Sequence, residues 1–181
     1  MHPVARRRSR LALRELGPAD VDAVHAVHGS AEATRHLSFE PRTREQCAGI
    51  VARSIASAGA APREEYAPAV TEGGEGPMIG FARLALDPHQ HRAATMGFAL
   101  RPDAWGVGHG TETVRLLLDL AFDDLDLHRV WAARAPENEA SARTLLSAGM
   151  TEEGRIRGHV LVRGRRRDSV VYGVLKEERP L

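Results

Sequence analysis

Cysteine and lysine are nearly missing from this sequence of 181 residues. Cys47 is the single cysteine, so the chain can form neither an internal disulfide nor a cysteine-based metal cluster. It falls among apolar residues of a predicted helix, where we expect it to pack as a small hydrophobic side chain. Lys176 is the single lysine, and arginine supplies the remaining strongly basic side chains. Together with the abundant alanine, this bias indicates genomic base composition rather than a functional choice.

Long apolar runs and a strong net charge are also lacking. No stretch reaches the ~18 consecutive apolar residues that a membrane helix needs, and no signal-peptide-like run follows the N-terminal arginines. We therefore expect a cytoplasmic protein without a membrane partner. The formal net charge of +1 does not favour wholesale binding to nucleic-acid phosphates. Length and a hydrophobic content of 43% favour one domain over residues 1–181, with residues 1–9 flexible.

Hydrophobic periodicity predicts a mixed α/β chain. Two helices are expected early, one after Pro18 and one that begins at the cap Thr43, where Glu45 and Gln46 suit a capping box, and ends at Gly59. Alternating apolar and polar residues, with glycine and proline between them, predict strands at 10–16, 65–71, 78–86, 92–102, 128–135, 150–161 and 168–176. A helical spacing of apolar residues from 110 and from 138 predicts two later helices. The order β-α-α-β-β-β-α-β-α-β-β predicts an α+β (mixed α/β) sheet with helices on both faces.

The most informative segment is LRPDAWGVGHGTETVRLLLDLAF, residues 100–122. It runs from a strand through a glycine-rich turn into an amphipathic helix. Gly106, Gly108 and Gly110 lack side chains, so their amides can approach a ligand closely. The first turn of a helix leaves N–H groups unpaired and carries partial positive charge. This combination suits a phosphate or pyrophosphate.

Three interpretations of this turn compete. A Walker loop needs a Gly-Lys-Ser/Thr sequence, and the segment has no lysine. A dinucleotide-binding fingerprint needs its glycines in an early βαβ unit, whereas this turn comes late and follows a predicted antiparallel meander. An ordinary tight turn would need no ligand at all.

The run WGVGHGTE after a strand ending in Arg-Pro resembles the coenzyme-A-binding segment of GNAT acetyltransferases. It is most similar to the branch that contains ribosomal-protein N-terminal acetyltransferases, in which Trp105 fits although the wider superfamily has Arg or Gln there. A second segment, PENEASARTLLSAGM, resembles the family's Asn-x-x-Ser helix. The resemblance implies a mostly antiparallel twisted sheet of about seven strands with about four helices. It also implies an N-acetyltransferase that takes acetyl-CoA as cosubstrate and a primary amine as acceptor, without a metal.

The resemblance also implies which residues hold the coenzyme. Backbone groups of Phe98, Ala99 and Leu100 would line the pantetheine arm. The pyrophosphate would lie on the backbone amides of the turn, which is formed by Gly106, Val107, Gly108, His109, Gly110 and Thr111. The hydroxyl of Thr111 would add a further contact. Asn138 would bond the pantetheine, and Ser141 would face the sulfur and protonate the leaving thiolate. Simple helix capping and first-turn backbone bonding are the alternatives for Asn138 and Ser141.

The expected reaction is direct attack of a neutral amine on the thioester, with proton transfer by nearby groups. Many relatives carry a glutamate in the fourth strand, where this chain has Thr95. The base is therefore open, with an ordered water and Glu40 as candidates. An α-amine has a pKa near ~8 and a lysine amine near ~10.4, so a missing carboxylate favours an α-amine or another amine of low pKa.

Six arginines cluster between residues 155 and 167 and support a rival interpretation, a nucleic-acid-binding module. Aromatic residues total 4%, which leaves few platforms for base stacking and speaks against that rival. The resemblance instead places the cluster on a hairpin near the acceptor site, where it would attract an acidic substrate. Ribosomal N-termini, small amines, amino acids and antibiotics all fit as acceptors. A homodimer is compatible with the resemblance.

Overall fold

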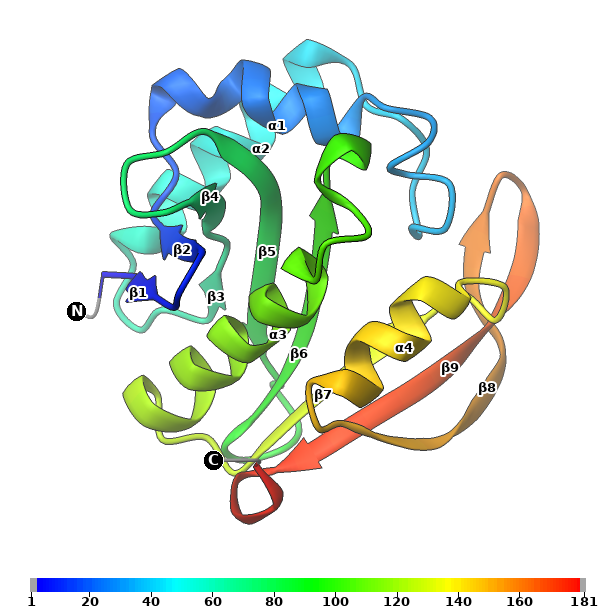
Figure 1. The fold of residues 1–181 in the computed structure, drawn as a ribbon. Coiled ribbons are helices and arrows are strands. Elements are labelled where there is room, and N and C mark those ends of the chain that lie inside the picture. The colour runs from blue at the N-terminus through cyan, green and yellow to red at the C-terminus, as the bar shows by residue number, and fades with distance from the viewer. Residues whose placement is uncertain (1–2, 180–181) are drawn as a thin grey trace.

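The structure is a computed structural model that describes residues 3–179. In this part of the chain, one nine-stranded sheet has the order β1-β2-β4-β5-β6-β7-β9-β8, with β3 paired to β5 (Figure 1). The strands are β1 (Ala5–Arg7), β2 (Leu11–Arg14), β3 (Glu65–Tyr66), β4 (Ala69–Glu72), β5 (Met78–Leu86), β6 (Ala93–Leu100), β7 (Arg129–Arg134), β8 (Thr151–Val162) and β9 (Arg165–Leu175). The helices are α1 (Val21–His28), α2 (Arg44–Ala58), α3 (His109–Asp119) and α4 (Glu139–Ser147). Neighbouring strands are antiparallel, except that β6 and β7 are parallel.

The predicted order of elements is confirmed, and two short strands, β1 and β3, add to it. The segment predicted as one strand at 65–71 divides into β3 and β4, because Pro68 cannot donate to a ladder. The prediction of a flexible segment at residues 1–9 is wrong for 5–7, which form β1 against β2. Arg6, in β1, binds Asp124, which follows α3. Arg8, just after β1, binds Asp119 at the end of α3.

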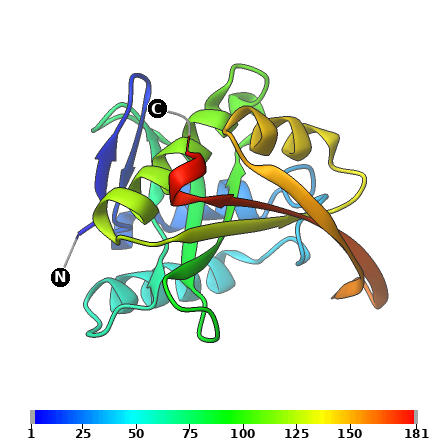
Figure 2. The same cartoon turned by 90° about the horizontal axis from the view of Figure 1, so that it is seen from below.

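The helices cover both faces of the sheet, α1 and α2 on one face and α3 and α4 on the other (Figure 2). Leu117 of α3 and Leu145 of α4 pack into one core with the alternate residues of the central strands. Val24, Cys47 and Val51 of α1 and α2 pack with Phe81 into a second core. The expected packing of Cys47 is confirmed, since its side chain is fully buried. No helix in the described part of the chain is long and apolar enough to span a membrane.

The parallel strands β6 and β7 are paired over only part of their length. Ala93 to Met96 lie opposite Arg129 to Ala132, and β6 then continues to Leu100 beside β5 alone. The sheet therefore opens at its centre, between the C-terminal halves of β6 and β7 (Figure 1). This opening, which we call the β6–β7 gap, exposes one edge of β6 from Gly97 onward.

Candidate active site

The strand register decides which backbone groups of β6 face the β6–β7 gap. The amide of Asp87 donates to the carbonyl of Ala93, and the amide of Arg101 donates to Ile79, both at 2.8 Å. Backbone groups alternate between the two edges of a strand in an antiparallel ladder. Ala99 therefore turns its amide and carbonyl to β5, while Phe98 and Leu100 turn theirs to the gap.

Trp105 forms a hydrogen bond with one of these gap-facing backbone groups. Its indole Nε1 donates to the carbonyl of Leu100 over 3.0 Å. The amide of Leu100 and both backbone groups of Phe98 remain directed at the gap. A ligand lying there would meet two donors and one acceptor, which suits the amide groups of a pantetheine-like chain.

The glycine-rich turn leads from β6 into α3 with two residues in the left-handed region. Gly106 has φ of 78° and Gly108, the N-cap of α3, has φ of 87°. Only glycine adopts these values without strain, so the turn needs both. The N–H groups of the first turn of α3 are left for a ligand. The Nδ1 atom of His109, the first residue of α3, is also buried without a hydrogen-bond partner among residues 3–179.

Gly110 also affects how α3 packs against its neighbours. A Cβ atom at Gly110 would lie 3.3 Å from the side chain of Thr144 in α4 and 3.6 Å from the ring of Phe98. The missing side chain thus lets α3 pack closely against α4 and β6. A side chain at position 110 would push α4 away, so Gly110 sets the distance between α3 and α4.

Arg10 and Glu112 clamp the turn to the N-terminal strands. Nη1 of Arg10 donates to the carbonyl of Val107 at 2.7 Å, and its Nε donates to Glu112 at 3.0 Å. Glu112 also accepts the backbone amides of Arg10 at 2.9 Å and Leu11 at 3.0 Å. Burial raises the pKa of Glu112, but the backbone and Arg10 donors outweigh burial and leave the pKa below its usual value. Sequence reasoning missed this clamp; its signal is an acidic residue on the apolar face of α3.

Asn138 begins α4 as predicted. Its Oδ1 accepts the amide of Ser141 at 3.1 Å, which confirms the capping role and leaves Nδ2 free to donate. Arg134 holds the loop before Asn138, since its Nη1 donates to the carbonyls of Ala135 at 3.1 Å and Pro136 at 2.7 Å. Asn138 and Ser141 are both half-buried in the first turn of α4.

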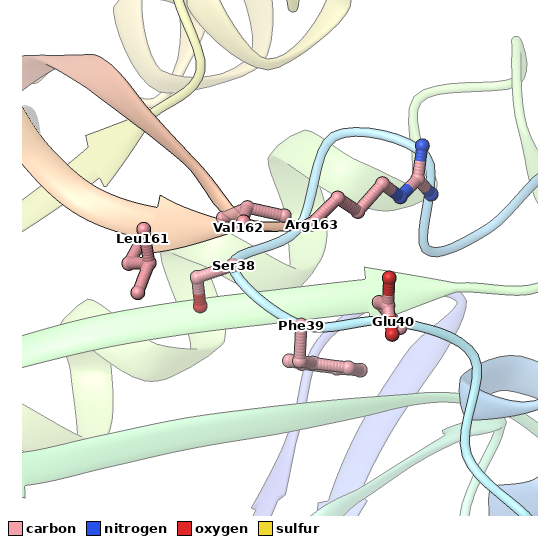
Figure 3. A pocket seen from close by; sticks show the side chains of 7 residues that line it. Ser38, Phe39, Glu40, Leu161, Val162 and Arg163 are labelled. Atoms are coloured by element: carbon pink, nitrogen blue, oxygen red, sulfur yellow. The ribbon is translucent and has the colours of Figure 1, made fainter.

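A pocket of about 380 Å³ lies between the α1–α2 loop and the tip of the β8–β9 hairpin (Figure 3). Ser38, Phe39 and Glu40 of the loop face Leu161, Val162 and Arg163 of the hairpin, with Gly164 completing the lining. We call this the loop–hairpin pocket. Nη1 of Arg167 donates to the carbonyl of Leu37 over 3.2 Å and ties the hairpin to the loop.

Aromatic contacts connect the loop–hairpin pocket to β6. The Phe39 ring meets the His28 ring edge-on at 5.1 Å, and His28 meets Phe81 in the same way at 5.1 Å. Phe81 lies opposite Ala99 in the ladder. Ring contacts therefore link the wall of the pocket, on the α1–α2 face of the sheet, to β5, the antiparallel neighbour of β6. Burial, and then the charge of Arg42, lower the pKa of His28 to about 4, so its imidazole is neutral near pH 7.

The structure brings most predicted site residues around one opening. The turn at 106–111 follows β6, and α4 packs beside α3 where Thr144 lies close to Gly110. Thr95 is half-buried in β6, between Ala85 and Trp131. Glu40 lies in the α1–α2 loop, where it is exposed on the wall of the loop–hairpin pocket.

A sheet that splits beside a glycine-rich turn is compatible with an enzyme that works on a coenzyme A thioester. Residues 10–151 match the acetyltransferase (GNAT) domain family. The chain belongs to this family and is an N-acetyltransferase that uses acetyl-CoA. No group of three side chains suited to hold a metal ion occurs within residues 3–179.

Relatives are similar over most of the chain. An uncharacterized N-acetyltransferase, p20, from Bacillus licheniformis is 29% identical over 93% of this chain and 94% of its own length. A putative ribosomal N-acetyltransferase, YdaF, from Bacillus subtilis is 33% identical over 58% of this chain and 57% of its own. Mycobacterium smegmatis RimJ in complex with CoA-disulfide superposes with a TM-score of 0.85 at 21% identity, covering 100% of this chain and 93% of that one. Spermidine N-acetyltransferase from Vibrio cholerae, in complex with CoA and spermine, gives 0.81 at 22%, covering 94% and 98%. These structures share the fold.

Proposed function

We propose that the β6–β7 gap holds the pantetheine arm of acetyl-CoA and that the loop–hairpin pocket receives the amine. One observation carries this proposal: the gap-facing backbone of Phe98 and Leu100 lies between the glycine-rich turn and the aromatic path from the pocket. Acetyl-CoA supplies the acetyl thioester when it binds. The two reactants would approach β6 from opposite faces of the sheet and meet at the gap.

The residues present fit this coenzyme. The amides of the turn, from Gly106 to Thr111, and the hydroxyl of Thr111 would hold the pyrophosphate, where the positive end of α3 favours negative charge. Phe98 and Leu100 would bond the pantetheine arm through their backbone. A gap-facing amide of β6 would also donate to the thioester oxygen as negative charge develops on it. Asn138 would add a donor through Nδ2.

In this mechanism, side chains are needed only for proton transfer. Alignment of the amine with the thioester lowers the barrier by several kcal/mol, on the order of what oriented intramolecular reactions gain. Ser141 would protonate the leaving thiolate. Thr95 provides no carboxylate, so Glu40 on the pocket wall or an ordered water would take the proton of the amine.

The acceptor suited to this site is the α-amine of a polypeptide. Its pKa near ~8 leaves a usable neutral fraction at pH 7 without a strong base, unlike a lysine amine near ~10.4. The similarity to a putative ribosomal N-acetyltransferase supports this choice. A cytoplasmic location and a homodimer stay predictions from the sequence.

Acetyl-CoA binding and turnover test the proposal. Acetyl-CoA at 100 times its dissociation constant should stabilise the protein by about 2.7 kcal/mol, which thermal melts measure. A free-thiol assay with peptides, polyamines and aminoglycosides should then show acetyl-CoA consumption that depends on an amine. An unchanged melting temperature at millimolar acetyl-CoA, or coenzyme binding without transfer to any amine, would contradict it.

Val107 offers a matched pair of variants for the turn. This residue is 56% exposed and its backbone is not in the left-handed region, so substitution leaves the turn unstrained. Val107→Glu should weaken acetyl-CoA binding about tenfold, because a carboxylate beside the phosphates opposes them. Val107→Lys should bind at least as tightly as the wild type. Equal affinities of the two variants would show that the phosphates lie elsewhere.

A further inference from the structure

We propose that the amine acceptor is the N-terminus of an acidic polypeptide, held by arginines around the loop–hairpin pocket. This inference rests on the proposed function and adds the chemical class of the acceptor. Glu40 would hold the N-terminal ammonium in the pocket. The arginines at the hairpin tip would bind the acidic side chains that follow.

The charge around the pocket is strongly positive. The two segments that form it, residues 35–42 and 155–168, hold eight arginines and only two acidic residues, Glu40 and Asp168. Asp168 is bound to Arg155, at 2.8 Å. Within residues 3–179 the other seven arginines have no carboxylate partner: Arg35, Arg42, Arg157, Arg163, Arg165, Arg166 and Arg167. A face with this balance attracts anionic partners and repels polycationic amines.

Two of these arginines also lack acceptors for buried donors. The Nε atoms of Arg42 and Arg167 are buried and have no hydrogen-bond partner in the described chain. Arg42 lies over the Phe39 ring at 4.4 Å, and Arg167 reaches the loop at Leu37. A buried charged donor without an acceptor is costly. Both guanidinium groups adjoin the pocket loop, and no carboxylate of the described chain neutralises them.

The shape of the arginine cluster favours a peptide over a small acid. Arg163 lines the pocket, and Arg165 and Arg166 continue from it at the start of β9. An extended peptide places its side chains at intervals of about 3.3 Å per residue, the same spacing as a strand. Since alternate side chains of an extended chain share one face, acidic side chains at alternate positions could meet arginines on one face of the hairpin, whereas a single small anion would use one. Phe39 and Leu161 give the first residue apolar contacts.

Nucleic acid fits this surface less well. Phe39 is the single aromatic residue of the two segments, and its ring is already covered by Arg42. Proteins that bind single strands combine a basic groove with exposed aromatic rings on which the bases stack. The carboxylate of Glu40, exposed in the pocket, would also repel a phosphate.

Matched peptides test the inference. Three peptides of equal length share the same first residue and continue with Asp/Glu, with Asn/Gln or with Lys/Arg; spermidine is a fourth substrate. We expect kcat/KM for the acidic peptide to exceed that of the neutral peptide by about tenfold, and this preference to shrink as salt rises. The basic peptide and spermidine should be the poorest substrates.

A charge-reversal variant links the preference to the hairpin. The triple variant Arg163→Glu, Arg165→Glu, Arg166→Glu should raise KM for the acidic peptide about tenfold, if each exposed pair contributes a few-fold. Its affinity for acetyl-CoA should stay within about twofold of wild type, and its KM for the acidic peptide should rise more than its KM for the neutral peptide, since rim charges act locally. Arg53→Glu, at an exposed position of α2, is the control and should change neither the KM for the acidic peptide nor the affinity for acetyl-CoA. If the triple variant does not fold, Arg165→Glu alone is compared with Arg53→Glu, and a rise in KM for the acidic peptide is required.

Several results would overturn the inference. Equal kcat/KM for the three peptides, or a preference for spermidine, would remove the acidic acceptor while leaving the acetyltransferase assignment intact. An RNA oligonucleotide that binds through the same arginines and displaces the acidic peptide would assign the surface to nucleic acid. If acetyl-CoA binds and another amine is acetylated but no peptide is, the acidic peptide is not the acceptor and the inference is refuted. Failure to bind acetyl-CoA at all would instead refute the proposed function, on which the inference rests.

Discussion

At the scale of the residue, two polar side chains at the site combine structural and functional demands. Asn138 uses Oδ1 to cap α4 and keeps Nδ2 for a ligand. His28 supports the pocket ring Phe39 while it is 5% exposed and kept neutral by burial. Each residue can be changed so that one of its tasks is lost and the other is kept.

Substitution of Asn138 separates capping from coenzyme binding. Asn138→Ala removes both atoms and should cost about 1 kcal/mol of stability from the lost cap. Asn138→Asp keeps a capping oxygen and should unfold near the wild-type denaturant midpoint. Both variants lack Nδ2 and should bind acetyl-CoA more weakly, which a titration measures. Wild-type affinity in Asn138→Asp would limit Asn138 to its capping role.

His28 should make stability depend on pH. Its pKa is about 4 in the folded protein against an ordinary 6.5, so protons bind the unfolded chain first as the pH falls. The contribution is complete above pH 6.5 and is lost as the pH falls toward 4, by about 3 kcal/mol in total. His28→Gln should flatten this part of the stability curve, measured by urea unfolding at several pH values. His91→Gln, at an exposed position, should leave it unchanged. An equal slope in His28→Gln and wild type would contradict the assignment.

At the scale of the element, α3 is positioned by a contact between segments about a hundred residues apart. Glu112 accepts the amide of Leu11 at the start of β2, and Arg10 donates to the carbonyl of Val107 in the glycine-rich turn. Gly110 fixes the spacing of α3 to α4 on the other side. The turn is thus held from both neighbours before any ligand arrives.

Glu112→Gln should loosen this arrangement. Hydrogen bonds to a charged group contribute about 1.5–3 kcal/mol each, and the amide retains some of them, so a net loss of about 2 kcal/mol is expected in urea unfolding. The pKa of Glu112 is depressed below 4.5, so its contribution is present above pH 4.5 and is lost as the pH falls through the depressed value. The variant should lack that acid-side loss. Glu45→Gln, exposed in the first turn of α2, is the control and should cost at most a few tenths of a kcal/mol. Identical stability of Glu112→Gln and wild type would contradict the clamp.

At the scale of the whole molecule, the two ends of the described chain meet at the end of α3. Arg8 binds Asp119 at 2.7 Å, and Arg179 binds the same carboxylate. Arg6 binds Asp124 beside them. This group of ion pairs joins β1, α3 and the segment after β9, and explains why residues 5–7 are ordered as a strand.

Asp119→Asn should weaken this junction. The side chain of Asp119 is only 9% exposed, so its loss leaves two arginines without their shared partner in a poorly solvated place. We expect a loss of about 2 kcal/mol in urea unfolding. The exposed pair of Arg83 with Glu65 is the comparison: Arg83→Gln should change stability by less than about 1 kcal/mol. Equal effects of the two variants would contradict the special role of the junction.

The local features of this fold could be predicted from the sequence. Thr43 and Asn138 cap their helices, and Gly149, with φ of 94°, follows α4. Apolar periodicity predicts the helices and most strands, and the spaced glycines predict the tight turn before α3. These features depend on residues within one or two turns of each other, so a short stretch of sequence determines them.

The tertiary structure decided what depends on distant segments. The separation of β6 from β7, the gap-facing backbone of Phe98 and Leu100, and the spacing role of Gly110 follow from register and packing between elements. The loop–hairpin pocket joins residues 38–40 to 161–164, and the clamp joins Arg10 to Val107. Periodicity carries no information on such pairings, because strand register and helix packing are set by how complementary surfaces far apart in the chain bury one another.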